Sequence, residues 1–434
     1  MSREMKYSGI PWIGEIPKDW SINLLSSLFD EHKQKNKDLS ETNLLSLSYG
    51  KIIRKDINTK EGLLPESFDG YNIISDGDIV FRLTDLQNDK RSLRTGLCFE
   101  KGIITSAYVT IRARQELHSP YYHYLVHSYD VCKVFYGMGD GVRQSMNYSD
   151  LRKLFLISPS FSEQQKIVEF LDKKCDEVDE MIALQEQIIE ELKAYKQSVI
   201  TEAVTKGLNP NVPMKDSGIE WIGEIPEHWE IHPFKAYYKT TKGLNITKEN
   251  LVESGIPVIS YGQIHSKLNS GTSICDELIR YVPESYLVSN PECLSKKFDM
   301  FFADTSEDRE GAGNMAFIDT DTPIFAGYHT IIARPNEEIK TKYFAYLTKT
   351  DAWRTQIRNS ISGVKVFSIS QKLINRAYII IPTPTEQQSI ADYLDKKCDE
   401  IDKLIAIKQQ KIESLKEYKK SIIYEYVTGK KEVV

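Results

Sequence analysis

The chain has 434 residues and carries 56 Lys and Arg against 62 Asp and Glu, so its formal net charge is −6. This length is enough for about two or three domains. The hydrophobic fraction of 41% and the charged fraction of 27% exclude an ordinary disordered chain. No apolar run reaches the roughly 18 to 20 residues of a membrane span, the charged N-terminus does not read as a signal peptide, and none of the six cysteines forms a C-x-x-C pair. These features favour a cytoplasmic protein with no membrane partner.

The first predicted element is a short motif that occurs twice. It reads MKYSGIPWIGEIPKDW over residues 5–20 and MKDSGIEWIGEIPEHW over residues 214–229. A repeat of this kind indicates that one structural unit is used twice. Two tryptophans flank Gly-Glu-Ile-Pro in each copy, so we expect a turn that clamps a domain onto the helices. Pseudo-twofold symmetry then predicts that residues 5–20 pack near the end of the last helix.

A variable block of mixed α/β character follows each motif. Alternating apolar residues predict strands in matching order, and an aromatic run then predicts a helix. The expected strands are 44–49, 78–82 and 107–114 in the first block and 257–261, 299–303 and 327–334 in the second, with helices at 121–125 and 343–347. Tyr108 and Tyr328 align within this scheme and are expected in the core. Residues 311–314 are expected in a hairpin loop.

A long segment rich in Glu, Lys, Gln, Leu and Ile closes each half. Neither Gly nor Pro occurs between Ser162 and Lys206, which predicts a helix of about 60 Å at 1.5 Å per residue. We expect Ser162 and Thr385 to cap the two helices. The 4,3 spacing of apolar residues is typical of a coiled-coil seam, with polar interruptions at Gln185, Lys408, Lys196 and Lys419. Antiparallel pairing as a rigid spacer is expected; a core helix within one globule is the alternative.

A second apolar stripe accompanies the seam on both helices. A two-helix coil would leave such a stripe in water, so we expect it to dock another helical protein. The alternative is packing against the chain's own variable blocks. The stripe comprises Met181, Leu184, Ile188, Tyr195, Leu404 and Tyr418.

Catalytic signatures are missing from the sequence. It contains no G-x-x-x-x-G-K-[ST] phosphate loop, no G-x-G-x-x-G after a strand, no H-E-x-x-H and no G-x-S-x-G. The eight histidines do not cluster at ligand spacing. We therefore expect neither a catalytic nor a metal site in this chain.

The repeated E-Q-x-x-I-x-x-[FY]-L-D-x-K helices and the W-I-G-E-I-P-x-x-W motifs resemble those of one family over essentially the whole chain. The chain is similar to the specificity subunits of type I restriction-modification enzymes. This resemblance implies an α+β fold, with two homologous mixed α/β target-recognition domains separated by a pair of long antiparallel coiled-coil helices. The expected segments are 1–158 and 208–381 for the recognition domains and 159–207 and 382–434 for the spacer helices.

The resemblance also implies partners. Each recognition domain would read one half of a bipartite, asymmetric double-stranded DNA target, and the helices would set the spacing and dock two modification (methyltransferase) subunits. Two restriction (translocase–nuclease) subunits would complete the assembly. This chain would bind no cofactor, because S-adenosylmethionine belongs to the modification subunits and ATP with Mg²⁺ to the restriction subunits.

Readers of DNA need side chains that bond base edges, such as Arg and Lys for guanine and Asn and Gln for adenine. In the first block the candidates are Tyr49, Lys51, Arg54, Arg82, Thr84, Arg91, Arg94, Arg143, Gln144 and Ser145. In the second block they are Tyr261, Gln263, Lys267, Thr305, Arg309, His329, Lys365 and Phe367. Arg82 aligns with Ala303, which fits divergent recognition.

Alternatives remain open at this point. A methylation-only system without a nuclease, a coiled-coil scaffold that binds two proteins, and a self-contained nuclease each predict a different behaviour with DNA. Net acidity argues against DNA binding at first sight, yet residues 21–158 hold 18 basic and 17 acidic side chains. Residues 159–207, in contrast, hold 6 basic and 11 acidic ones. The excess acid therefore lies largely away from the expected reading surfaces.

Overall fold

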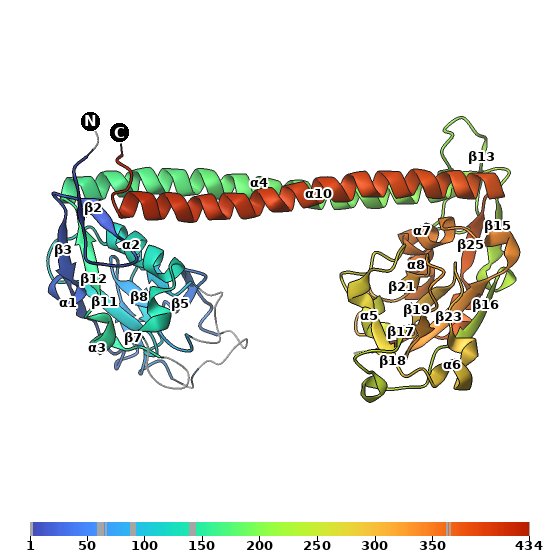
Figure 1. Ribbon diagram of the computed structural model, residues 1–434, viewed down its shortest axis with the longest axis horizontal. Coiled ribbons are helices and arrows are strands. Elements are labelled where there is room, and N and C mark those ends of the chain that lie inside the picture. The colour runs from blue at the N-terminus through green and yellow to red at the C-terminus, as the bar shows by residue number, and fades with distance from the viewer. Residues whose placement is uncertain are drawn as a thin grey trace. The chain divides into compact units, whose positions relative to one another are not determined.

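The computed structural model describes residues 3–58, 65, 67–86, 93–138, 145–361, 363 and 366–433. Its contacts divide the chain into two units, unit 1 with Met1–Glu186 and Gln409–Val434, and unit 2 with Gln187–Lys408. Each unit holds one mixed α/β domain and part of each of two long helices (Figure 1). The four segment boundaries expected from the sequence stay predictions. Within the described residues, no helix is both long and apolar enough to cross a membrane.

Unit 1 is built on a four-stranded antiparallel sheet. Helix α2 (Ser119–Val131) contacts β9 and contributes buried residues to the same hydrophobic core as the sheet. The sheet order is β4 (Phe29–Glu31), β11 (Val109–Ala113), β8 (Ile79–Phe81) and β9 (Thr95–Leu97). Two-stranded sheets pair β5 (Leu45–Ser48) with β6 (Lys51–Arg54), β7 (Asn72–Ile74) with β10 (Gly102–Ile104), and β3 (Ser21–Leu24) with β12 (Phe155–Ser158). Short helices α1 (Leu25–Leu28) and α3 (Tyr148–Leu151) complete the domain.

Unit 2 repeats this plan with its own additions. Its main sheet runs β16 (Tyr238–Lys242), β23 (Thr330–Pro335), β19 (Met300–Ala303) and β21 (Met315–Phe317). A second sheet runs β18 (Arg280–Val282), β17 (Ile256–Ile259) and β22 (Phe325–Ala326), while β15 (Glu230–Pro233) pairs with β25 (Tyr378–Ile381) and β20 (Thr305–Ser306) with β24 (Phe367–Ser368). The helices are α5 (Tyr261–Ile264), α6 (Tyr286–Ser289), α7 (Tyr343–Lys349), α8 (Asp351–Arg358) and α9 (Gln371–Arg376).

The predicted mixed α/β blocks are confirmed, but one alignment is wrong. Residues 311–314 do lie in the hairpin loop between β19 and β21. Buried Asp78 binds Arg112 in unit 1, and buried Asp299 binds Arg334 in unit 2. Arg112 is therefore the counterpart of Arg334, two residues out of step with the alignment that pairs Tyr108 with Tyr328. Both tyrosines are only partly buried against hydrophobic clusters.

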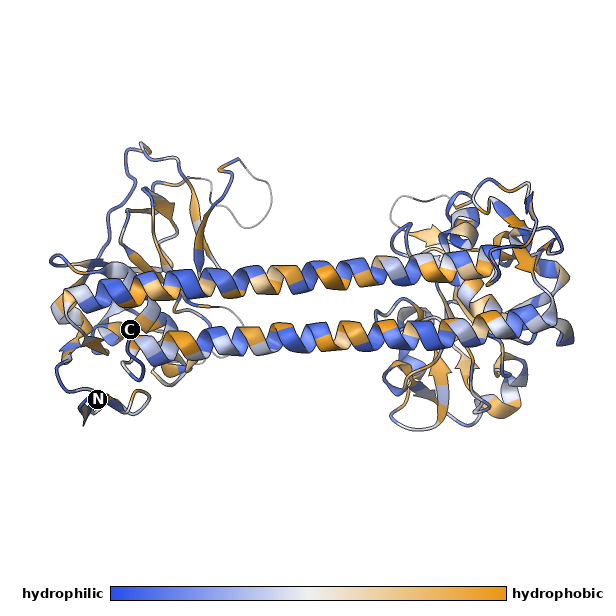
Figure 2. Cartoon of the chain, turned by 90° about the horizontal axis from the view of Figure 1, so that it is seen from above, coloured by the Kyte–Doolittle hydropathy of each residue, from blue (hydrophilic) through white to orange (hydrophobic). Residues whose placement is uncertain are grey.

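The long helices α4 (Phe161–Lys206) and α10 (Pro384–Val427) pack against each other in opposite directions. In unit 1, the rings of Phe170 and Tyr426 lie 4.3 Å apart, and Lys419 binds Asp179 at 2.7 Å. In unit 2, Lys196 binds Asp402 at 2.6 Å. The predicted antiparallel packing is thus observed within each unit. Figure 2 shows apolar residues recurring along both helices among hydrophilic ones.

The lysines that interrupt the seam have a physical explanation. Lys196 and Lys419 occupy matching places in the two helices, and each forms an ion pair with an aspartate of the opposite helix. A lysine at a seam position is tolerated when its charge is neutralised, and it then favours one register over others. These pairs therefore fix how the two helices align.

The predicted helix caps are wrong by two residues. The backbone N–H of Glu163 donates to the hydroxyl of Ser160, and that of Glu386 donates to the hydroxyl of Thr383, at 3.3 and 3.4 Å. Glu386 in turn accepts from the Thr383 backbone N–H at 3.2 Å, which completes a capping box. Each helix therefore begins earlier than the expected caps Ser162 and Thr385, which lie inside it.

Each tryptophan motif joins the start of one long helix to the end of the other. In unit 1 the strands are β1 (Met5–Tyr7) and β2 (Glu15–Pro17), and in unit 2 they are β13 (Met214–Asp216) and β14 (Glu224–Pro226). Trp20 donates its indole N–H to Glu163 at 3.0 Å, and a Cβ placed at Gly429 would meet the same ring. Trp229 has the equivalent relation to Glu386 and Gly207. The predicted packing of residues 5–20 near the end of the last helix is confirmed.

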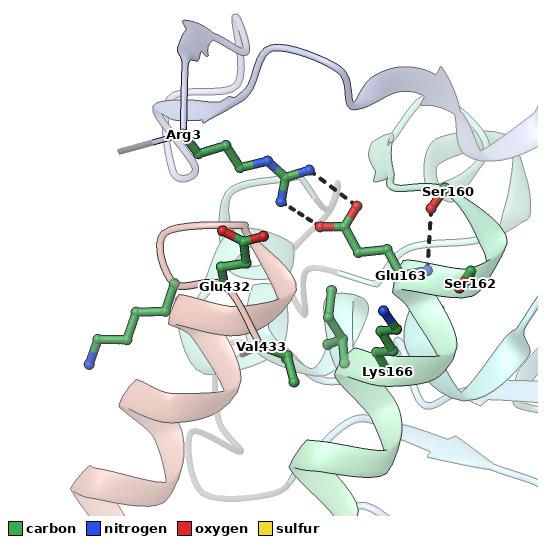
Figure 3. A pocket seen from close by; sticks show the side chains of 9 residues that line it. Arg3, Ser160, Ser162, Glu163, Lys166, Glu432 and Val433 are labelled. Atoms are coloured by element: carbon green, nitrogen blue, oxygen red, sulfur yellow. Dashed lines mark hydrogen bonds and ion pairs between the residues drawn. The ribbon is translucent and has the colours of Figure 1, made fainter. Parts of the chain in front are cut away.

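Additional bonds reinforce the joint in unit 1. Arg3 binds Glu163 beside a cavity of about 210 Å³ that the end of the chain also lines (Figure 3). Tyr424 on α10 donates its hydroxyl to the carbonyl oxygen of Trp12 at 2.9 Å. Tyr121 on α2 donates to the carbonyl oxygen of Val427 at 2.9 Å, as Tyr343 does to Val204 in unit 2. The domain, the motif and both helices are therefore held together as one packed unit.

Candidate nucleic-acid interface

One strongly exposed candidate of unit 1 is at the tip of a hairpin. Strands β5 and β6 pair with Ser48 opposite Lys51, so Tyr49 and Gly50 form the two-residue turn. Their φ angles of 45° and 80° are both positive, as a type I′ turn requires. Tyr49 is 80% exposed in this strained backbone. The hairpin therefore presents an aromatic side chain to solvent with little freedom in its backbone.

Two basic candidates lie on the second strand of this hairpin. Lys51 is exposed. The guanidinium of Arg54 forms two hydrogen bonds through Nε and one through Nη2 to the carboxylate of Glu100, at 2.5 to 2.9 Å. This contact raises the pKa of Arg54 and lowers the pKa of Glu100. Arg54 would have to exchange this partner to contact DNA.

The predicted role of Arg94 in DNA binding is wrong. Its side chain is fully buried, and its guanidinium donates to the carbonyl oxygens of Thr84 at 2.7 Å and Asp85 at 3.2 Å. The guanidinium also lies 5.4 Å from the ring of Tyr136. A buried arginine with these partners organises the loop after β8 and does not face an external ligand. Thr84 itself is exposed, and Arg82 is partly buried.

Other candidates fall at the edge of what the structure describes. Arg91, Arg143, Gln144 and Lys365 lie outside the described residues. Ser145 is the first described residue after that gap, and it is exposed.

The structure brings several candidates of unit 2 into one surface patch. The ring of Tyr261 lies 5.5 Å from that of His329, in an edge-to-face arrangement. His265 Nε2 donates to the carbonyl oxygen of Thr305 at 2.8 Å, so this nitrogen carries the proton. Strand β24 with Phe367 pairs with β20 next to Thr305. We name Tyr261, His265, Thr305, His329 and Phe367 the aromatic patch.

His329 stands out within the aromatic patch. Its φ angle is 55°, a conformation that non-glycine residues seldom adopt. Its Nδ1 lies 3.0 Å from Asp304 Oδ1, and its side chain is 58% exposed. The backbone N–H of Asp304 also donates to the His329 carbonyl oxygen at 3.1 Å. The strand ladder therefore continues into a strained, exposed His–Asp pair.

A cavity of about 580 Å³ adjoins the aromatic patch. Its lining includes Tyr261 and His265, together with Asp308 and Glu310 from the loop before β21. Asn314 bridges the wall, because it donates to His265 Nδ1 at 3.0 Å and accepts from Arg354 at 2.7 Å. Burial lowers the pKa of Arg354, and the charge of nearby Arg358 adds to this effect. Asn314 thus joins His265 to Arg354 across the cavity wall.

The remaining candidates of unit 2 have different positions. Gln263 accepts from the Ser260 backbone N–H at 3.1 Å and so caps α5. Arg309 is exposed and donates to the carbonyl oxygen of Arg358 at 3.1 Å. Lys267 is exposed. The positions of these three residues do not test a role in DNA binding.

The stripe on the long helices is largely exposed. Exposed fractions are 49% for Met181, 53% for Leu184, 55% for Tyr195, 47% for Leu404 and 51% for Tyr418, whereas Ile188 is partly buried. Ile407, which was not predicted, is 60% exposed on the same helix as Leu404.

Sequence reasoning missed Asp304, Asn314 and Arg354. Asp304 follows a predicted strand directly, and that position could have drawn attention to it. Asn314 and Arg354 are joined only by the fold, 40 residues apart in the chain. Among the described residues, no group of three or more His, Cys, Asp or Glu side chains comes together as a metal site would require.

Comparison with known proteins gives a consistent result. A family model described as "Type I restriction modification DNA specificity domain" matches residues 17–194 and 229–417. The specificity subunit of the type I restriction enzyme MjaVIII from Methanocaldococcus jannaschii is 25% identical over 275 residues, which cover 63% of this chain and 61% of that protein. The chain thus matches less than two thirds of that relative. The putative MjaX specificity subunit of the same organism is 25% identical over 96% of this chain and 95% of its own length.

A solved structure has the same fold. It comes from work on complex assembly and conformational transition of the type I R-M system. It superposes with a TM-score of 0.69 at 14% identity, over 95% of this chain and 99% of its own.

Proposed function

The chain belongs to the type I restriction-modification DNA specificity family, and on this premise we propose that each of its two units reads one half of a bipartite, asymmetric DNA target. The long helices set the distance between the half-sites. The chain itself catalyses no reaction.

The observation that supports two independent readers is a shared scaffold with different surfaces. The Asp78–Arg112 and Asp299–Arg334 pairs occupy equivalent places in the two sheets. In that register the counterpart of Ala303 is Arg82, at the end of the same strand. Unit 1 presents the Tyr49 hairpin, whereas unit 2 presents the aromatic patch. Such divergence on a constant frame is expected where two domains read unlike sequences.

We propose that the exposed stripe on α4 and α10 docks two modification subunits, and that two restriction subunits join them. Exposed apolar side chains such as Leu184 and Tyr418 are expected at an interface. S-adenosylmethionine, ATP and Mg²⁺ would then be bound by those subunits and not by this chain. The nearly balanced charge of residues 21–158 supports weak DNA binding by the chain alone, because phosphate neutralisation dominates affinity.

The decisive experiment co-expresses the chain with its modification subunit and maps methylated adenines across a genome. Two fixed half-sites at constant spacing are expected. Absence of any DNA methylation or salt-sensitive DNA binding by the complex would favour a protein scaffold. Metal-dependent cleavage by the purified chain alone would favour a nuclease. Methylation without restriction in a complete operon would indicate a methylation-only system.

Independence of the two readers can be tested at Tyr49. Tyr49→Ala should relax or abolish recognition of one half-site and leave the other unchanged. Tyr7→Ala is a matched control, because Tyr7 is also an exposed tyrosine, at 67%, but belongs to the tryptophan motif. Equal loss of both half-sites would contradict independent reading.

The spacing role can be tested by lengthening both helices. One heptad inserted after Ile188 and one after Gln409 keeps the register that the two ion pairs define. Seven residues add about 10 Å of helix, or roughly three base pairs. Methylome mapping should show the same half-sites with a longer spacer. An unchanged spacer would contradict the proposal.

A further inference from the structure

The His329–Asp304 pair of unit 2 has a defined hydrogen-bonding polarity. An ionised carboxylate can only accept hydrogen bonds. Asp304 Oδ1 lies 3.0 Å from His329 Nδ1 and accepts also from the Thr305 hydroxyl at 2.8 Å. The proton of a neutral imidazole is therefore held on Nδ1. The other ring nitrogen, Nε2, is left as an acceptor.

Exposure and backbone strain indicate that Nε2 of His329 accepts a hydrogen bond from a group outside the chain. The His329 side chain is 58% exposed, and its φ of 55° costs free energy that a glycine or asparagine would largely avoid. Strain of this kind is typical of binding sites. The ring also packs edge-on to Tyr261 and Tyr328, which restricts its orientation.

Unit 1 does not have this pair at the corresponding described positions. In the pairing register of the main sheets, the counterparts of Asp304 and His329 in unit 1 are Leu83 and Ala107. Leu83 is buried and Ala107 is exposed. Both members of the pair are therefore replaced together, as expected for a feature that serves recognition and not the common scaffold.

We propose that His329 is a specificity-determining residue of unit 2, and that its Nε2 accepts a hydrogen bond from the exocyclic amino group of adenine or cytosine. Asp304 is the positioning residue that keeps this nitrogen an acceptor. In the major groove, the amino groups N6 of adenine and N4 of cytosine donate, whereas O6 of guanine and O4 of thymine accept. The pair thus distinguishes amino bases from carbonyl bases. This inference rests on the proposed function.

The experiment uses the full chain assembled with its modification subunit and duplexes that carry the mapped target. Each adenine of both half-sites is replaced in turn by purine and each cytosine by pyrimidin-2-one, which lack the amino group. Wild-type complex should lose about 10-fold in affinity at one position of one half-site. His329→Gly, which is compatible with the left-handed backbone, should show less than 2-fold loss on the same duplex. His329→Ala provides a second variant.

A matched control is His232→Ala. His232 on β15 also pairs with a carboxylate, Glu230, at 2.7 Å, but lies outside the aromatic patch. The His232→Ala complex should lose about 10-fold in affinity on the modified duplex, as the wild-type complex does. In the Asp304→Ala variant no carboxylate holds the proton on Nδ1, so Nε2 of His329 can carry the proton and donate to a carbonyl base. This variant should therefore bind a target with guanine or thymine at that position about 10-fold better than wild type does. If Asp304 had a purely structural role, its replacement would not change the preference from amino bases to carbonyl bases.

The outcomes distinguish a failure of the His329 proposal from a failure of the proposed function. If His329→Gly remains as sensitive as wild type at every modified position, or if wild type is sensitive at none, His329 does not read an amino group. The proposed function itself fails only if the wild-type complex neither methylates nor binds a bipartite target.

Discussion

The indole nitrogen of Trp20 lies 3.0 Å from the carboxylate of Glu163, in the first turn of helix α4. Glu163 also accepts from Arg3, so one carboxylate ties the N-terminal motif and the residue two positions before it to the start of the helix. Trp229 and Glu386 repeat the contact at 3.1 Å in unit 2. An acidic residue in the first turn is also favoured by the helix dipole.

Glu163→Ala should therefore lower the free energy of unfolding by about 1 to 3 kcal/mol, because it leaves the buried indole N–H without its acceptor. Chemical denaturation followed by tryptophan fluorescence measures this effect. Glu169→Ala is the control, since Glu169 is exposed on the same helix and should change stability by less than about 0.5 kcal/mol. Equal effects of the two substitutions would contradict the structural role of Glu163.

Charge reversal tests the register of the long helices. Lys196→Asp places like charges opposite Asp402 and should destabilise unit 2, and Asp402→Lys should act likewise. The double variant restores an ion pair and should recover most of the loss. A coupling free energy of about 1 kcal/mol or less is expected from thermal unfolding, because the Asp402 side chain is 57% exposed. Additive losses in the double variant would show that the pair does not set the register.

Arg94 should behave as a structural residue. Arg94→Leu leaves the carbonyl oxygens of Thr84 and Asp85 without their donor, so it should lower stability by about 2 kcal/mol or more. Arg54→Leu removes only a solvent-exposed ion pair and should lower stability much less than Arg94→Leu does. Denaturation of both variants decides the point. A stable Arg94→Leu variant with altered half-site specificity would instead indicate that Arg94 takes part in DNA recognition.

Two histidines on α2 should make unit 1 sensitive to acid. Burial lowers the pKa of His123 to about 3, with a contribution from His127, and burial with the charge of Lys419 lowers the pKa of His127 to about 4. The unfolded chain takes up these protons near pH 6.5, whereas the folded chain does not. Stability from these residues is therefore complete above about pH 6.5 and is lost as the pH falls toward 4.

His127→Gln removes one of these proton-uptake sites. The variant should lose stability less steeply than wild type between pH 6.5 and 4.5, by at most about 1.4 kcal/mol for each pH unit. Thermal unfolding at stepped pH measures the slopes, and the two proteins should follow parallel curves above pH 7. Identical slopes at low pH would show that His127 is protonated equally in both states.

Much of the fold was predictable because it repeats. Two copies of the helix pattern and of the strand order predicted the long helices and both sheets. The caps were missed by two residues, since local sequence offers several hydroxyls, Ser160 and Ser162 among them, and only the fold selects one. The alignment of Tyr108 with Tyr328 was wrong because it relied on identical residue types. The ion pairs of Arg112 and Arg334 with buried aspartates show the correct register.

The candidate site was less predictable than the fold. Surface exposure of an arginine cannot be inferred from its neighbours in sequence, and Arg94 is buried by contacts with Thr84 and Asp85 that a loop reading does not show. The His329–Asp304 pair joins residues 25 apart in the chain and depends on the strand register. Chemistry that arises from such pairing needs the three-dimensional structure.

The division of the chain has a consequence for its synthesis. Unit 2 is one continuous stretch, Gln187–Lys408, and can pack as soon as that stretch has left the ribosome. Unit 1 cannot, because Tyr121 bonds to the carbonyl oxygen of Val427 and Ile423 lies in its core. Its strands are made first, yet they must wait through some 250 further residues, at about 5 to 20 residues each second. The earlier-made domain is thus the later to be completed, and for roughly 13 to 50 seconds it depends on other means, such as chaperones, to remain free of aggregation.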